Sequence, residues 1–90
     1  MDRIHAVIHG RVQGVNFRST TQREAQRLKL GGWVRNNPDG TVEVVAEGPR
    51  DLLEAFEDFL HNGPLAADVE SVDLSWHEGT GMFDYFSIKY

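Results

Sequence analysis

Apolar and polar residues alternate near the start of the chain, and this pattern predicts a β-strand over residues 4–9. One face of the predicted strand carries Ile4, Ala6 and Ile8, and the other carries His5, Val7 and His9. Gly10 is expected to end the strand, because glycine interrupts regular structure.

The next segment, residues 11–16, has no regular period and is predicted to be a loop. From about Phe17 or Arg18 to Lys29 the apolar spacing becomes helical. The start of this helix stays open, because Thr21-x-x-Glu24 resembles a capping box and would begin the helix later.

The rest of the chain divides at clear turn signals. In order, the patterns predict a strand at 32–35, a turn at 37–40, a strand at 41–47, a helix opening at 48–49 and ending at 61–64, a strand at 72–76, a turn at 79–81 and a last strand at 86–88. The order is β-α-β-β-α-β, with a hairpin splitting the final element. We therefore predict a ferredoxin-like α+β sandwich, an antiparallel sheet with two helices on one face.

Composition narrows the possible functions. Ninety residues predict a single domain over 1–90, and the absence of cysteine excludes a disulfide scaffold and a thiol nucleophile. A net charge of −5, with only two lysines, argues against nucleic acid as the main partner. An RNA-binding module of this topology would need exposed aromatic and basic residues on its middle strands, and the strand at 41–47 offers neither. No segment has the signal or the apolar length for export or membrane insertion, so we expect a cytoplasmic protein with no membrane partner.

Two segments carry candidate chemistry. The loop between Gly10 and Arg18 joins a strand to a helix start, where successive backbone N–H groups can form a nest for an anion. Asn36 lies where a strand runs into its hairpin, and its amide can both accept from water and donate to a phosphate. Taken singly, each segment favours a purely structural role: a connecting loop with a surface arginine, and a turn-capping asparagine.

Together, the two segments resemble the signatures of the acylphosphatase family. The first is Ile8-x-Gly10-x-Val12-Gln13-Gly14-Val15-x-Phe17-Arg18, and the second is Gly32-Trp33-Val34-Arg35-Asn36-x-x-x-Gly40-x-Val42 with Gly48 beyond it. Their spacing also fits, and the resemblance runs the length of the chain. It implies an enzyme that hydrolyses the carboxyl–phosphate bond of acyl phosphates, without cofactor, metal or covalent phosphoenzyme, as a cytosolic monomer.

The resemblance also assigns roles to residues. Arg18 would be the phosphate-binding catalytic residue and Asn36 would position the attacking water. The phosphate-binding loop would comprise Val12, Gln13, Gly14, Val15, Asn16 and Phe17. Phosphate and sulfate would then compete with the substrate.

The motifs contain no side chain placed as a general acid, and acyl phosphate chemistry explains why none is needed. The leaving group is a carboxylate with a pKa of about 4, which is stable as an anion at neutral pH. A metal site is not expected either: His5 and His9 share a strand face, but their Cα atoms would lie about 13 Å apart. The alternatives are a non-catalytic anion-binding or regulatory domain, or a piece of a larger carbamoyl-phosphate-handling protein, although the length and the initial methionine favour a free-standing enzyme.

Overall fold

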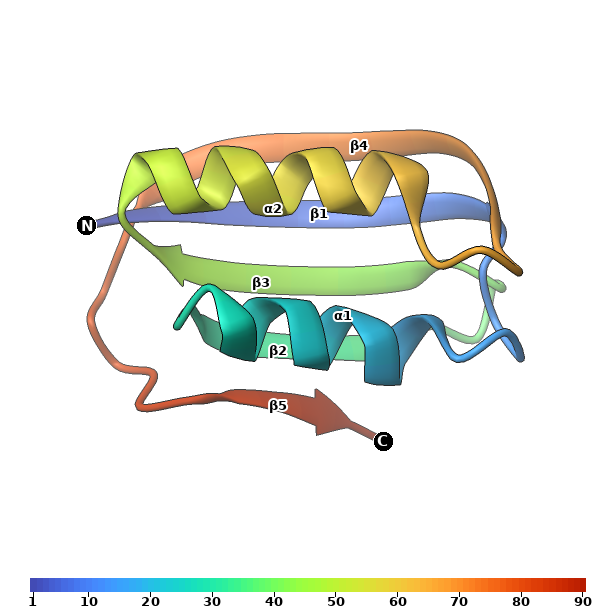
Figure 1. The fold of residues 1–90 in the computed structure, drawn as a ribbon, viewed down its shortest axis with the longest axis horizontal. Coiled ribbons are helices and arrows are strands. Elements are labelled where there is room, and N and C mark those ends of the chain that lie inside the picture. The colour runs from blue at the N-terminus through green and yellow to red at the C-terminus, as the bar shows by residue number, and fades with distance from the viewer.

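In the computed structural model, which describes residues 1–90, two helices cover one face of a five-stranded sheet (Figure 1). The elements in chain order are β1 (Asp2–Arg11), α1 (Phe17–Arg27), β2 (Gly31–Asn36), β3 (Val42–Gly48), α2 (Arg50–Asn62), β4 (Asp68–Glu78) and β5 (Phe86–Lys89). The ferredoxin-like α+β class predicted from the sequence is confirmed. Neither helix combines the length and the hydropathy that crossing a membrane requires.

The strands lie in the order β4-β1-β3-β2-β5. Four of them pair antiparallel as predicted, whereas β5 joins the edge of the sheet parallel to β2. The expectation of a hairpin between the last two strands is therefore wrong, because β4 and β5 occupy opposite edges (Figure 1). Residues 79–81 do turn the chain, but Glu47 of β3 accepts hydrogen bonds from the backbone N–H groups of Thr80 and Gly81 and from the Thr80 hydroxyl. The chain then crosses the end of the sheet (Figure 1).

The core lies between the sheet and the helices. The alternation predicted for the first strand is confirmed, since Ile4, Ala6 and Ile8 are fully buried on the inner face of β1. Val42, Val44 and Ala46 of β3 alternate in the same way and are also fully buried. From the helices, the core receives Phe17 and Ala25 of α1 and Leu53, Phe56 and Leu60 of α2. The three residues from α2 recur at helical spacing and make its buried apolar stripe, and Leu52 and Phe59 lie partly buried at the margin of that stripe.

The start of α1 matters for the site and is settled by packing. The helix begins at Phe17, with Asn16 as its N-cap, and not at the capping-box pattern further on. Phe17 is 1% exposed and Thr21 is fully buried, so the core holds the helix from its first residue and leaves no cap position at Thr21. Tertiary burial has overridden the local signal.

The strand before this helix is longer than predicted. β1 continues through a register shift between His9 and Gly10 and ends at Arg11. Gly10 has a φ of 126°, and a Cβ there would lie 2.1 Å from the backbone oxygen of Asp68. Glycine is therefore required at this irregularity, which directs the chain into the loop that follows.

Candidate active site

Residues 12–16 form a short loop between the end of β1 and the start of α1. Gly14 and Asn16 both adopt left-handed backbone conformations, with φ of 74° and 63°. Residues in such conformations turn neighbouring backbone N–H groups toward one side of the chain, which makes a concavity suited to an anion. The first turn of α1 adds its unpaired N–H groups and the positive end of its dipole.

The two ends of this loop are anchored in the core. Val12 and Phe17 are each 1% exposed, and Val15 packs against the core between them. The carbonyl of Asn16 accepts hydrogen bonds from the backbone N–H of Thr20 at 3.0 Å and from the hydroxyl of Ser19 at 3.2 Å. The loop is therefore held in place by apolar side chains below it and by the first turn of the helix beside it.

A cavity of about 290 Å³ opens against this loop. Six of the residues singled out in the sequence line it: Val12, Gly14, Asn16, Phe17, Arg18 and Asn36. The structure thus brings together two segments that are separated by the whole of α1. Gln13 and Val15 belong to the predicted loop but do not line the cavity.

Arg18 lies in the first turn of α1 and is partly buried, yet no carboxylate lies within ion-pair distance of it. Four other arginines do form ion pairs: Arg3, Arg27, Arg35 and Arg50. The guanidinium carbon of Arg18 lies 5.2 Å from the ring centre of Tyr90. A cation–π contact of this kind does not use the N–H donors of Arg18 in a hydrogen bond to a carboxylate, so they stay available to a ligand.

Asn36 is the last residue of β2, directly before the β2–β3 turn. Its position is fixed by pairing with Val42 across the hairpin. The side-chain oxygen Oδ1 is buried, and no protein group donates a hydrogen bond to it. A buried acceptor without a donor costs about 1–3 kcal/mol, which a donor entering the cavity would offset.

Three further residues line the cavity that the sequence did not single out: Ser19, Ile88 and Tyr90. Ser19 follows Arg18 in the first turn of the helix. Ile88 and Tyr90 reach the cavity because β5 lies beside β2, with Ile88 opposite Val34. The wrongly expected final hairpin would have placed both far away, so pattern reasoning had no signal for them.

The four histidines have separate partners and do not converge. His5 contacts Glu43 at 2.6 Å, His9 contacts Asp73 at 3.0 Å, His61 contacts Glu57 at 3.4 Å and His77 contacts Ser75 at 2.8 Å. The hydrogen bond from His5 lowers the pKa of Glu43, burial opposes this, and Arg35 adds to the lowering. No three carboxylate or histidine side chains gather in a way that could hold a metal ion.

Comparison with known proteins gives one consistent result. The model of the acylphosphatase family matches residues 4–88. An acylphosphatase from Salinibacter ruber is 48% identical over 97% of this chain and 92% of its own length. An acylphosphatase from Thermococcus kodakarensis is 50% identical over 89% of this chain and 88% of its own. The crystal structure of acylphosphatase from Bacillus subtilis superposes with a TM-score of 0.96 at 39% identity, and each chain covers 100% of the other.

Proposed function

This chain belongs to the acylphosphatase family and is a hydrolase of acyl phosphates, and on that premise we propose that the cavity lined by Arg18 and Asn36 is its active site. Arg18 and the backbone N–H groups of residues 12–17 bind the phosphoryl group, and Asn36 orients the attacking water. The reaction splits the substrate into a carboxylate and inorganic phosphate. Residues 1–90 act as one catalytic domain.

The observation that carries this proposal is that Arg18 lines the cavity and has no carboxylate partner. A partly buried guanidinium that faces a cavity without a carboxylate partner is costly unless an anion occupies the cavity. Its planar fork can donate two parallel hydrogen bonds to phosphate oxygens. The net charge of the chain is −5, so this local positive potential must come from Arg18, the loop amides and the helix dipole together.

The unpartnered oxygen of Asn36 supports the second role. A carboxamide oxygen that accepts a hydrogen bond from an O–H of water fixes the orientation of that water, and the amide nitrogen can donate to the phosphoryl group. Water then attacks phosphorus as the bond from phosphorus to the carboxylate oxygen breaks. The bonding electrons leave with the carboxylate, and the protons of the water leave with the phosphate.

The lack of histidine and carboxylate side chains around the cavity agrees with the leaving group. Its lining includes no histidine, aspartate or glutamate. A carboxylate with a pKa of about 4 departs without protonation, whereas an alkoxide would need an acid. Charge in a loose phosphoryl-transfer transition state spreads over the phosphoryl oxygens, where positioning and positive potential stabilise it.

The experiment is hydrolysis of benzoyl phosphate, with EDTA present throughout. We expect turnover that EDTA does not reduce, and competitive inhibition by inorganic phosphate and by sulfate. Activity that EDTA abolishes and a divalent ion restores would overturn the metal-free reaction. We further propose a cytoplasmic monomer, which gel filtration and cell fractionation would test.

A further inference from the structure

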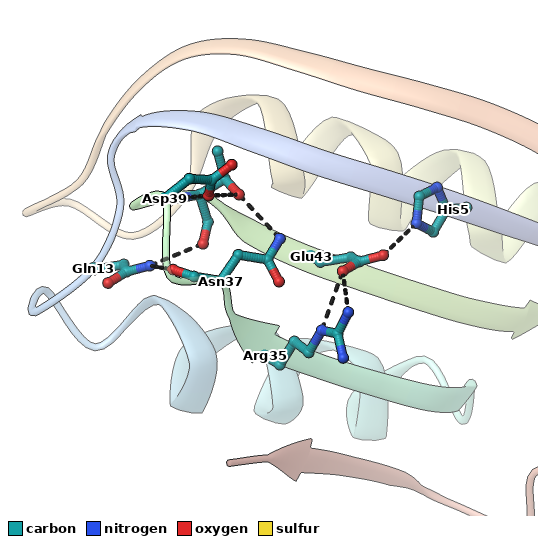
Figure 2. A network of polar contacts seen from close by, with 7 residues as sticks. His5, Gln13, Arg35, Asn37, Asp39 and Glu43 are labelled. Atoms are coloured by element: carbon teal, nitrogen blue, oxygen red, sulfur yellow. Dashed lines mark hydrogen bonds and ion pairs between the residues drawn. The ribbon is translucent and has the colours of Figure 1, made fainter.

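The side chain of Gln13 links the two segments of the proposed active site. Its amide nitrogen donates hydrogen bonds to the backbone oxygens of Asn37 at 2.8 Å and of Thr41 at 2.9 Å (Figure 2). These partners lie 24 and 28 residues away in the chain, in the β2–β3 turn. Gln13 itself does not line the cavity. Its side chain therefore faces the turn that follows Asn36, while its backbone belongs to the phosphate-binding loop.

The amide nitrogen of Gln13 and the two carbonyl oxygens that it contacts are all fully hydrogen-bonded. A primary amide nitrogen has two N–H donors, and both are used. The oxygen of Asn37 also accepts from the backbone N–H of Gly40 at 3.2 Å, and the oxygen of Thr41 accepts from the N–H of Asn37 at 2.8 Å. Each carbonyl has two lone pairs, so no other donor is needed at either. The two hydrogen bonds from Gln13 therefore hold both ends of the β2–β3 turn, Asn37 and Thr41.

The turn is also held by hydrogen bonds among its own residues. The side chain of Asn37 donates to the hydroxyl of Thr41 at 3.0 Å, and that hydroxyl and the Thr41 N–H donate to Asp39 at 2.6 and 3.0 Å (Figure 2). Because these bonds hold the turn in one shape, the hydrogen bonds from Gln13 fix the position of the whole turn and of the residues next to it. The residue directly before this turn is Asn36.

On the other side of Asn36, Arg35 is tied across the hairpin to Glu43. Its Nε and Nη2 donate to one carboxylate oxygen at 3.1 and 2.8 Å (Figure 2). Asn36 is thus held between two fixed neighbours. The bonds to Glu43 join β2 to β3, within the hairpin. The bonds from Gln13 are different, because they join the hairpin to the phosphate-binding loop, the other segment of the proposed active site.

We propose that Gln13 is a positioning residue for hydrolysis: its side chain holds Asn36, and with it the attacking water, in register with the bound phosphoryl group. This inference rests on the proposed role of Asn36. Misplacement of a reacting group by about 1 Å can cost about 10²-fold in rate. Phosphate binding uses the backbone of the loop and Arg18, and so depends less on this side chain.

The test begins with Gln13→Met, which keeps the length and the backbone N–H but removes both donors. With benzoyl phosphate we expect kcat to fall about 10-fold or more, while the inhibition constant of inorganic phosphate changes less than about threefold. The matched control is Gln22→Met. Gln22 also donates from a partly buried amide to a backbone oxygen, that of Phe86 at 3.4 Å, but far from the turn. Its kcat should not change. Unchanged kcat in Gln13→Met, or an equal loss of phosphate affinity, would overturn the proposal.

A double-mutant cycle separates this inference from the function beneath it. If Gln13 acts through Asn36, adding Gln13→Met to Asn36→Ala should lower kcat little further. A full additional loss would overturn the inference. Wild-type turnover in Asn36→Ala alone would instead overturn the proposed function. Low turnover in Asn36→Ala with wild-type turnover in Gln13→Met would overturn the role of Gln13 and leave the proposed function standing.

Gln13→Glu gives a second readout that a merely structural role would not move. Its carboxylate would face two carbonyl oxygens without a donor, and protonation would restore one. Such surroundings raise the pKa of the introduced carboxyl, so the donor returns as the pH falls. The ratio of variant to wild-type kcat should therefore rise toward acid pH, while circular dichroism shows a constant folded fraction. A ratio independent of pH would contradict the proposal, and this test stands even if Gln13→Met fails to fold.

Discussion

The two ends of the central strands β1 and β3 use polar side chains in different ways. At one end, Glu47 is almost fully buried and accepts hydrogen bonds from Arg3 at 2.8 Å and from Thr80 and Gly81 at 2.9 Å. At the other end, Arg18 has no carboxylate partner and the oxygen of Asn36 has no donor.

The difference separates a structural site from a reactive one. The charge of Glu47 is satisfied by the protein itself, so it holds the chain between β4 and β5 in place. The polar groups at Arg18 and Asn36 are left for a ligand to satisfy, and the fold bears that cost. Natural proteins break the rule of satisfied polar groups mainly where they function.

The largest effect is expected from removing the unpaired cation. Arg18→Ala should lower kcat/KM for benzoyl phosphate by at least about 10²–10³-fold and weaken phosphate inhibition, as for deleting a principal electrostatic stabiliser. Arg18→Lys should recover little, because it lacks the planar fork. The control is Arg11→Ala, an exposed residue outside the cavity, which should change activity only modestly.

The same variant should barely change stability. Removing Arg18 loses its contact with the exposed ring of Tyr90, worth about 0.5–1 kcal/mol. It also removes a cation from the first turn of α1, where the helix dipole disfavours positive charge by about 0.3–1 kcal/mol. The two terms oppose each other, so Tm should shift little. A large fall in Tm with retained turnover would instead make Arg18 a structural residue, and would contradict the contrast drawn between the two ends of the sheet.

The opposite pattern is expected for Glu47. Glu47→Gln keeps the shape but faces an amide NH₂ toward donors, so the free energy of unfolding should fall by about 2 kcal/mol. Turnover of the folded fraction should stay near that of the wild type, because Glu47 is not in the cavity. Denaturant unfolding measures the first effect. The control is Glu54→Gln on the exposed side of α2, which should leave stability unchanged.

Acid pH should also remove the contribution of Glu47 to the free energy of unfolding. Burial raises the pKa of Glu47, but the hydrogen bonds from Thr80, Gly81 and Arg3 outweigh it and lower the pKa overall. A carboxyl with a lowered folded-state pKa stabilises the protein fully above its unfolded pKa of about 4.3 and loses this as the pH falls through the folded value. The stability gap between wild type and Glu47→Gln should therefore narrow in acid, and a constant gap would contradict this account.

Local pattern predicted most of the fold because the inner faces are regular. The alternation of Ile4, Ala6 and Ile8, and the apolar stripe of α2, identified core positions without any knowledge of partners. The last strand could not be predicted in this way, since pattern does not say which edge a strand joins. In the structure β5 pairs with β2, and Phe86 is buried in the core, so the edge it joins is set by contacts between residues distant in sequence.

The candidate site also has residues that the sequence pointed to and residues that it did not. The resemblance to the acylphosphatase signatures singled out Arg18, Asn36 and the loop, whereas local pattern alone favoured structural roles for them. Ser19, Ile88 and Tyr90 were missed, and β5 brings the last two to the cavity by long-range pairing. The side chain of Gln13 was treated as part of the loop, and only its bonds to Asn37 and Thr41 reveal that it faces the turn. The proposed roles of these residues stay predictions.

The central claim is that the end of the sheet with unsatisfied polar groups binds the phosphoryl group. The most direct measurement is a titration of the ¹⁵N-labelled protein with inorganic phosphate, followed by backbone amide NMR. The account predicts saturable shifts that are largest for residues 12–18 and Asn36, absent at Thr80 and Gly81, and lost in Arg18→Ala. Shifts centred on residues 79–81 or elsewhere, with the 12–18 amides unmoved, would contradict it.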